Sequence, residues 1–204
     1  MIRILLVRHG QSEGNKIGVL QGHSDYPLSE EGIKQAKELG KKLLRDKESF
    51  NAIYSSDLSR AAETARIIAL ETNFEDIHLD DRLREFNLGI FEGKYTQFMT
   101  EEENEFLSSC WKDTAKRIPE GENVDEMVKR IKEAFNEIVE KHNQNETVII
   151  VAHGGTLFHI MQTILGFKLK DRDWFDNCKI TEIIQNSESK NWQVVKYNNE
   201  TLNS

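Results

Sequence analysis

The sequence predicts an α/β fold: a three-layer α/β/α sandwich around a mixed, largely parallel central sheet. Two short apolar runs, at residues 4–7 and 148–152, are rich in Ile, Val and Leu without alternation. Such runs are typical of strands that are buried on both faces. Segments with a helical period of 3.6 residues lie between them, and a chain in which strands alternate with helices usually forms a sheet covered by helices on both sides.

The elements between the two apolar runs can be placed from caps and apolar spacing. Ser29 is a suitable N-cap for a helix that extends to about residue 46. A short strand over 52–54 leads into a second helix over about 59–70. A third, long helix is predicted over about 123–142, with an apolar stripe formed by Val124, Met127, Val128, Ile131, Phe135, Ile138 and Val139.

After the second apolar run the sequence predicts a helix over about 156–165. Two strands, over 179–184 and 192–197, follow it and are joined by a turn at 186–189. The segment 96–119 is acidic and weakly patterned, and we expect a helical insertion there that covers the active site. Because no repeat or linker divides the sequence, we expect a single domain over residues 1–204.

Composition excludes several classes of function. The 204 residues are 38% hydrophobic and 30% charged, which is typical of a soluble globular protein. The net charge of −8 without a basic cluster argues against a nucleic-acid partner. No run reaches the roughly 20 apolar residues of a membrane span, and a secretory signal is missing, so we expect a cytoplasmic protein with no membrane partner. Cys110 and Cys178 stand alone and indicate neither a disulfide framework nor a zinc site.

Each of the two apolar runs ends in a His-Gly pair. His9 and Gly10 follow the first run, and His153 and Gly154 follow the second. Ligands of open α/β sheets bind at the carboxyl ends of the strands, so we expect both pairs there, on neighbouring strands. A predicted helix start after each pair favours an anion, and Arg8 adds donors suited to phosphate oxygens. These residues alone do not exclude the alternative that His9 and His153 are packed loop residues without a chemical role. A metal site is disfavoured, because Arg8 would repel a cation and no HxH or HxxxH pair is present.

Five motifs occur in an order that resembles the histidine phosphatase superfamily, in the branch that includes cofactor-dependent phosphoglycerate mutase. They are LVRHGQSEGN at 6–15, QGHSDYPLS at 21–29, SSDLSRAAETA at 55–65, LREFNLG with FEG at 83–93, and VAHGG at 151–155. Together they span most of the chain. The resemblance implies a phosphoglycerate mutase-like fold and a small phosphorylated metabolite as partner, with no cofactor and no metal. We expect a monomer or a homodimer.

The resemblance also implies a role for each matched residue. His9 would be the nucleophile that forms a phosphohistidine intermediate, and Glu85 would be the general acid. The phosphate pocket would be completed by Arg8, Arg60 and His153. Contacts to the phosphate or the leaving group would come from Asn15, Gln21, Gly22 and the backbone of Gly154.

Physical chemistry supports these roles. Phosphoryl transfer requires mainly positioning and charge neutralisation, which two guanidiniums and a protonated His153 would supply without a metal. His9 must be neutral to attack, so we expect its other ring nitrogen to donate to a backbone carbonyl. An alkoxide is a poor leaving group, so Glu85 must be protonated when the ester bond breaks, and the same carboxylate would then activate water.

Three functions fit this site: a phosphatase, a mutase and a non-catalytic binder of a phosphorylated ligand. Mutases of the family carry a longer insertion with an arginine pair and usually an Asn after the second His-Gly. Here that position is Gly155, and residues 96–119 hold three consecutive glutamates and no Arg-Arg pair, which favours hydrolysis. A non-catalytic relative would be expected to have lost a catalytic residue, and all are present. The substrate is not determined by the sequence, and sugar phosphates, phosphoglycerates, phosphoserine and α-ribazole phosphate all stay open.

Two further points are left to the structure. His23, next to Gln21 and Gly22, either touches the substrate or has a structural role. Three aromatic residues of the insertion either pack against the leaving group or form a small core of the insertion itself, and we expect the second: Phe98, Phe106 and Trp111.

Overall fold

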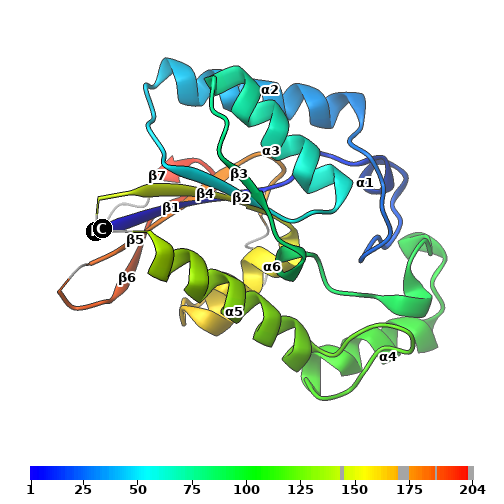
Figure 1. The fold of residues 1–204 in the computed structure, drawn as a ribbon. Helices are drawn as coiled ribbons and strands as arrows, with labels where there is room; N and C mark the ends of the chain where they lie inside the picture. The colour runs from blue at the N-terminus through cyan, green and yellow to red at the C-terminus, as the bar shows by residue number, and fades with distance from the viewer. Residues whose placement is uncertain (143–144, 170–174, 187, 202–204) are drawn as a thin grey trace.

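The structure, a computed structural model, describes residues 1–142, 145–169, 175–186 and 188–201. In this part of the chain a seven-stranded sheet lies between two layers of helices (Figure 1). Its order is β3-β2-β4-β1-β5-β6-β7, with parallel pairing from β3 to β1 and antiparallel pairing from β1 to β7. The strands are β1 (Ile2–Arg8), β2 (Ala52–Ser55), β3 (Ile77–Leu79), β4 (Thr147–Ala152), β5 (Ile180–Gln185), β6 (Trp192–Tyr197) and β7 (Glu200–Thr201). The predicted α/β sandwich with a mixed sheet is confirmed.

Two helices cover each face of the sheet. One face carries α2 (Glu30–Arg45) and α3 (Ser59–Thr72), and the other carries α5 (Val124–Lys141) and α6 (Gly154–His159) (Figure 1). The helix α2 begins after Ser29, whose side chain accepts a hydrogen bond from the backbone N–H of Gly32. Asn123 caps α5 in the same way, with the reciprocal contact from Glu126. Both starts agree with the predicted positions.

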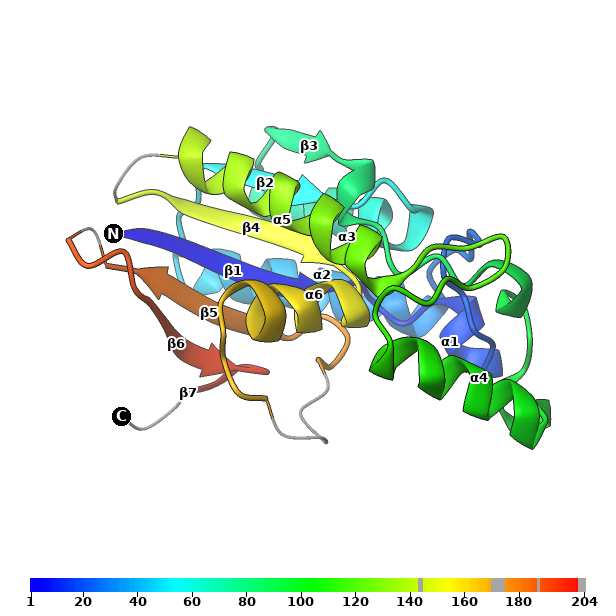
Figure 2. The same cartoon turned by 90° about the horizontal axis from the view of Figure 1, so that it is seen from below.

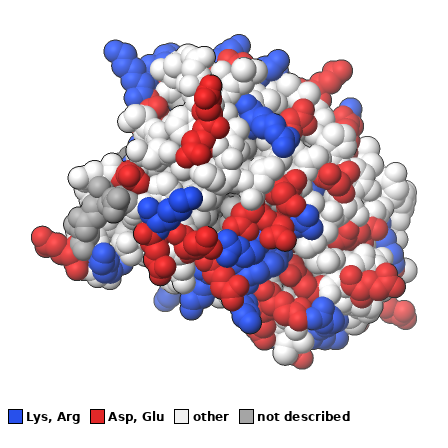
Figure 3. All heavy atoms as spheres, in the orientation of Figure 1, with Lys and Arg blue, Asp and Glu red and all other residues white. Residues whose placement is uncertain are grey.

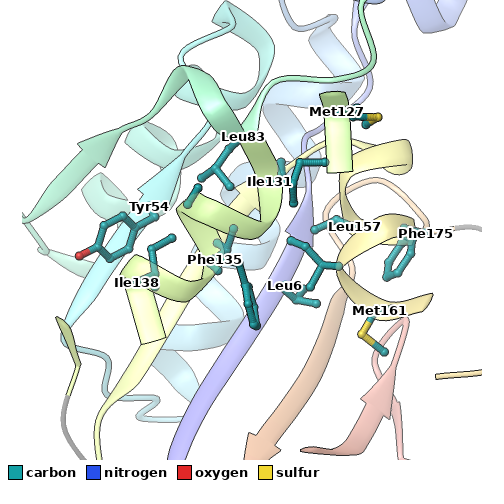
Figure 4. Close-up of a cluster of buried hydrophobic side chains, with 14 of the residues drawn as sticks. Leu6, Tyr54, Leu83, Met127, Ile131, Phe135, Ile138, Leu157, Met161 and Phe175 are labelled. Atoms are coloured by element: carbon teal, nitrogen blue, oxygen red, sulfur yellow. The ribbon is translucent and has the colours of Figure 1, made fainter. Parts of the chain in front are cut away.

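The core forms on both faces of the sheet, as the apolar runs predicted. Along β1, Ile4 and Leu6 face α5 and α6, whereas Leu5 and Val7 face α2 and α3. Figure 4 shows the first of these clusters, in which side chains of α5 pack against β1 and α6. Fully burying a side chain such as Phe135 contributes roughly 1.5–3 kcal/mol.

The sheet places the ends of β1 and β4 side by side. These strands are parallel neighbours, and Arg8 at the end of β1 lies opposite Ala152 at the end of β4. The backbone N–H of His9 donates to the carbonyl oxygen of Ala152 at 2.9 Å. In Figure 2, α1 (Glu13–Ile17) and α4 (Glu101–Lys112) lie beyond these strand ends. The two His-Gly pairs therefore meet at one edge of the sheet, as expected.

Several short elements were not predicted. The five-residue α1 is too short to show periodicity, although Ser12 and Asn15 form a reciprocal capping box at its start. Strands β3 and β7 are also too short for a pattern. The helix expected over 156–165 ends as α6 at His159 and continues as a π-helical turn, η4 (Ile160–Ile164). Of the turn expected at 186–189, residue 187 lies outside the described residues.

The insertion contains the helix α4 (Glu101–Lys112). Three short 3-10 turns precede α4: η1 (Asp81–Leu83), η2 (Gly89–Phe91) and η3 (Thr96–Phe98). The face shown in Figure 3 carries acidic and basic side chains interspersed with one another. Among the described residues, none of the helices combines the length and the apolarity that crossing a membrane requires.

Candidate active site

His9 lies directly after β1 and faces His153, which lies directly after β4. The two rings are 5.1 Å apart between centroids. The Nδ1 atom of His9 lies 2.7 Å from the carbonyl oxygen of Gly10. Burial, reinforced by the positive charges of Arg60 and Arg8, holds the pKa of His9 well below its usual value. His9 is therefore neutral, and Nδ1–H donates to the Gly10 carbonyl, which leaves the lone pair of Nε2 available for attack.

Gly10 is required at this turn by close packing. A Cβ atom at Gly10 would lie 2.6 Å from the carbonyl oxygen of Gly32 in α2. The backbone N–H of Gly10 donates to Thr64 Oγ1 of α3 at 3.0 Å, and Thr64 Oγ1 donates to the carbonyl oxygen of Arg60. The first turn of α3 is thereby fixed against the turn that carries His9.

Arg60 and Arg8 bring two guanidiniums to the histidines. Arg60, in the first turn of α3, is only 1% exposed, and its two Nη atoms donate to the carbonyl oxygens of Gly22 and Ser24 at 2.8 and 3.1 Å. Arg8 donates through Nη1 to the carbonyl oxygen of Phe175 at 2.8 Å. Burial lowers the pKa of both arginines, but a guanidinium stays protonated in proteins, so both carry a full positive charge.

His153 differs from expectation in its charge. Burial, with the positive charge of Arg60 next in importance, holds the pKa of His153 well below its usual value, so the residue is neutral rather than protonated in the protein without a bound anion. Its Nε2 lies 2.8 Å from Ser56 Oγ, which itself accepts a hydrogen bond from the backbone N–H of Leu58. The Ser56 hydroxyl can then donate to Nε2, which places the imidazole proton of His153 on Nδ1.

Buried donors without partners gather around His9. Among the described residues, Nε of Arg8, Nε of Arg60 and Nδ1 of His153 are buried and make no hydrogen bond. Leaving a buried polar group unpaired costs about 1–3 kcal/mol, and the cost is greater for a charged group. Three such groups around one neutral imidazole form a site that an anion with several acceptor oxygens would satisfy.

Glu85 approaches the histidines from a loop after η1. Its Oε1 accepts a hydrogen bond from the backbone N–H of Phe86 at 2.9 Å, and its Oε2 accepts one from Gly155 at 3.1 Å. A Cβ atom at Gly155 would lie 2.4 Å from Glu85 Oε1. The absence of a side chain at Gly155 therefore allows the carboxylate to reach its present position.

A cavity of about 1060 Å³ opens next to these residues. Most of the predicted site residues line it, namely Arg8, His9, Asn15, Gln21, Gly22, Arg60 and Glu85. His153 and Gly154 are not part of the lining. The ring of His153 lies 5.1 Å from that of His9 between centroids, and a Cβ atom at Gly154 would lie 3.8 Å from Arg8 Nε. Gly155, which the sequence did not single out for binding, lines the cavity instead.

Asn15 and Gln21 present amide groups to the cavity. The Ser12 hydroxyl lies 2.7 Å from Gln21 Oε1, and Asn15 Oδ1 accepts the backbone N–H of Ser12 at 3.1 Å. Both amide oxygens are thus occupied by Ser12. The amide NH₂ groups make no hydrogen bond to the described residues, and as donors they suit a phosphate oxygen or a hydroxyl of the substrate.

Sequence comparison identifies the family. The model of the histidine phosphatase superfamily (branch 1) matches residues 4–200. The chain belongs to this superfamily.

Relatives within the histidine phosphatase superfamily carry names for different reactions. A protein named probable phosphoglycerate mutase GpmB of Escherichia coli is 36% identical over 187 residues, which cover 90% of this chain and 85% of that protein. The crystal structure of an α-ribazole phosphatase from Shigella flexneri is 27% identical, with a TM-score of 0.81 over 99% of this chain and 98% of that one. A mutant phosphoserine phosphatase of Entamoeba histolytica in complex with phosphoserine is 27% identical, with a TM-score of 0.75 over 98% of each chain.

His23 binds the loop that carries Glu85 in this member of the superfamily. It does not line the cavity, and its Nε2 lies 2.8 Å from the carbonyl oxygen of Glu85. Burial lowers the pKa of His23, so the neutral ring donates through Nε2–H. The structure therefore assigns His23 the structural alternative.

The three aromatic residues of the insertion lie in three different surroundings, and they do not form a common core of the insertion. Trp111 lines the cavity and stacks on His159, with 6.2 Å between ring centroids, contrary to expectation. Phe106 packs on Phe91 in the core, and Phe98 is 75% exposed. Sequence reasoning missed several cavity residues from α5, α6 and η4 because they belong to ordinary helical patterns: Val124, Asp125, Val128, Phe158, His159, Gln162 and Thr163.

Burial of neutral His9 predicts that acid lowers the stability of this superfamily member. An unfolded histidine takes up a proton below about pH 6.5, whereas the folded pKa of His9 is depressed. The stability that neutral His9 contributes is therefore fully present above pH 6.5. Below that pH, the free energy of unfolding falls by about 1.4 kcal/mol per pH unit. Urea unfolding at pH 7.5 and pH 5.5 should show an acid loss about 1.4 kcal/mol smaller in His9→Gln than in the wild type. An equal loss would exclude a depressed pKa.

Proposed function

We propose that the protein is a phosphatase that hydrolyses phosphate monoesters of small metabolites through a phosphohistidine intermediate on His9. The observation that carries this proposal is the set of buried, unpartnered donors of Arg8, Arg60 and His153 around a neutral imidazole. They match the oxygens of a phosphoryl group, and the two guanidiniums match the charge of a dianion. Relatives named as phosphatases and as a phosphoglycerate mutase support a reaction that transfers a phosphoryl group.

In the first step, the lone pair of His9 Nε2 attacks phosphorus and the phosphorus–oxygen bond to the leaving group breaks. The electron pair of that bond goes to the leaving oxygen, and Glu85 donates its proton to the same oxygen. Negative charge on the phosphoryl oxygens is stabilised by the donors that lack partners in the free protein. The alcohol departs, and His9 carries the phosphoryl group.

In the second step, the Glu85 carboxylate accepts a proton from a water molecule whose oxygen attacks phosphorus. The nitrogen–phosphorus bond breaks, and its electron pair returns to His9 Nε2. Inorganic phosphate is released, with His9 neutral and Glu85 protonated for the next cycle. Glu85 lies within the lining of the cavity, where both the leaving oxygen and the water would be.

The charge of the cavity supports hydrolysis over phosphoryl return to a second anionic substrate. Among the described residues that line it, Arg8 and Arg60 are the only Lys or Arg side chains, and Asp125 adds a carboxylate. Nearby cations are paired elsewhere: Arg84 with Asp57, and Lys94 with Glu103. Among the described lining residues, a second phosphate or a carboxylate on the leaving group would therefore find no further Lys or Arg side chain.

Phosphate release from matched pairs of monoesters, measured in EDTA, tests this proposal. We expect metal-free turnover, because two arginines supply the positive charge. We also expect a higher kcat/KM for phosphoethanolamine than for phosphoserine, and for glycerol 3-phosphate than for 3-phosphoglycerate. A requirement for added divalent metal would contradict the mechanism. If no ester of the panel released phosphate, and the protein interconverted 2- and 3-phosphoglycerate in the presence of a bisphosphate primer, the protein would be a mutase instead.

A further inference from the structure

Arg130 of α5 reaches the backbone of the loop that carries Glu85. Its Nη1 donates to the carbonyl oxygens of Arg82 and Arg84 at 2.9 and 2.7 Å. Its Nη2 donates to the carbonyl oxygen of Glu85 itself at 2.7 Å. One guanidinium thus binds three carbonyl oxygens within four consecutive residues, and these are groups left without helical partners where η1 ends.

Glu122 holds the guanidinium of Arg130 in this orientation. Its Oε2 accepts from Arg130 Nε at 3.0 Å and its Oε1 from Nη2 at 2.5 Å, which is a bidentate ion pair. Glu122 Oε1 also accepts the backbone N–H of Asn87 at 2.8 Å, on the far side of Glu85 in the sequence. The side chains of Arg130 and Glu122 are only 17% and 12% exposed. The pair therefore forms hydrogen bonds with the backbone of the loop both before and after Glu85.

The position of the Glu85 carboxylate depends on this backbone. The carboxylate itself is held by two backbone N–H groups, from Phe86 and Gly155, and among the described residues it has no side-chain hydrogen bond of its own. His23 also binds the Glu85 carbonyl, and Thr156 Oγ1 binds the Arg84 carbonyl at 3.0 Å. A shift of the loop would move the proton of Glu85 away from the leaving oxygen, and a misplacement of about 1 Å can cost on the order of 100-fold in rate.

We propose that Arg130, oriented by Glu122, is a positioning residue that holds the Glu85 carboxylate where it can donate a proton to the leaving-group oxygen. The proposal rests on the proposed function, in which Glu85 is the general acid. It makes a distinct prediction: loss of Arg130 should impair proton delivery more than phosphate binding, because Arg130 does not line the cavity and does not touch His9, Arg8 or Arg60 in the described contacts.

The test compares kcat/KM for an alkyl ester, phosphoethanolamine, with that for p-nitrophenyl phosphate, whose leaving group needs little protonation. Because kcat/KM reports the steps up to phosphohistidine formation, the ratio isolates proton delivery to the leaving group. The ratio of two substrates on one sample does not depend on the fraction of protein that is folded. The variants are Arg130→Met and Glu122→Gln. Arg117→Met is the matched control, since Arg117 pairs with Glu126 and binds the Gly121 carbonyl without touching the loop 82–85.

We expect Arg130→Met to lower the ratio of alkyl to aryl kcat/KM by about tenfold or more, which is part of the 10²–10⁴-fold that a general acid contributes. Glu122→Gln should lower it in the same direction by less, and Arg117→Met should leave it unchanged. Equal losses on both esters in Arg130→Met would overturn the proposal and assign Arg130 to the fold alone. Glu85→Gln, measured in parallel, separates the two proposals. If Glu85→Gln lowers the ratio and Arg130→Met does not, the general-acid role of Glu85 is supported and the positioning role of Arg130 is excluded.

Discussion

His9→Ala is expected to lower phosphatase activity by about 10⁴-fold or more on every substrate, because it removes the atom that carries the phosphoryl group between the two steps of the proposed mechanism. The loss should be large for alkyl and aryl esters alike, since both require His9 Nε2 as the nucleophile in the first step. Initial rates of phosphate release by the wild type and the variant at equal concentration check this.

Two further measurements test whether His9 carries the phosphoryl group. Wild-type enzyme quenched in alkaline detergent after mixing with substrate should carry a phosphoryl group that is stable to base and labile to acid, and His9→Ala should carry none. The variant should still bind inorganic phosphate or vanadate, because Arg8, Arg60 and His153 keep their unpartnered donors. Substantial turnover in the variant would mean that water attacks the substrate directly and that no phosphohistidine is needed.

Glu85→Gln is expected to slow the hydrolysis of alkyl esters by 10²- to 10⁴-fold in kcat/KM, the usual contribution of a general acid, and to affect p-nitrophenyl phosphate far less. The amide keeps the shape of Glu85 and can still accept the backbone N–H of Gly155 or Phe86 through its oxygen, but it cannot supply the proton of a carboxylic acid. A series of esters with leaving groups of graded acidity should show a much steeper dependence in the variant.

The same variant separates the two tasks of Glu85. In kcat, which includes hydrolysis of the phosphohistidine, Glu85→Gln should also slow the aryl ester once the second step limits turnover, because water has lost its base. Equal losses of kcat/KM on alkyl and aryl esters would remove Glu85 from the acid role.

The longer elements and the meeting of the two histidines could be predicted from sequence. Helix α5 and strands β1 and β4 have patterns long enough to assign. The rule that parallel strands expose their carboxyl ends at one edge was sufficient to bring His9 to His153. The π-helical turn after α6 and the short strands β3 and β7 lack such patterns, since they are only 5, 3 and 2 residues long.

The remaining features of the site depend on burial and on contacts between distant segments. A neutral His153 follows from its complete burial next to Arg60, which a sequence does not show. His23 and Arg130 both bind the Glu85 carbonyl from 62 and 45 positions away in the chain. Arg130 in particular occurs in a charged helical stretch where a solvent-exposed side chain is the ordinary expectation.

The cavity divides into two halves of different origin. The phosphate half is made by strand ends and the first turns of helices, which the sheet fixes rigidly, whereas the other half is made by side chains of α4, α5 and α6, including Leu107, Trp111 and Val128. Changes in the second half need not disturb the first. Under the proposed function, the residues that transfer the phosphoryl group and the residues that contact the alcohol thus lie on different elements, so substitutions in the helical half are expected to change the choice of alcohol and to leave phosphoryl transfer intact.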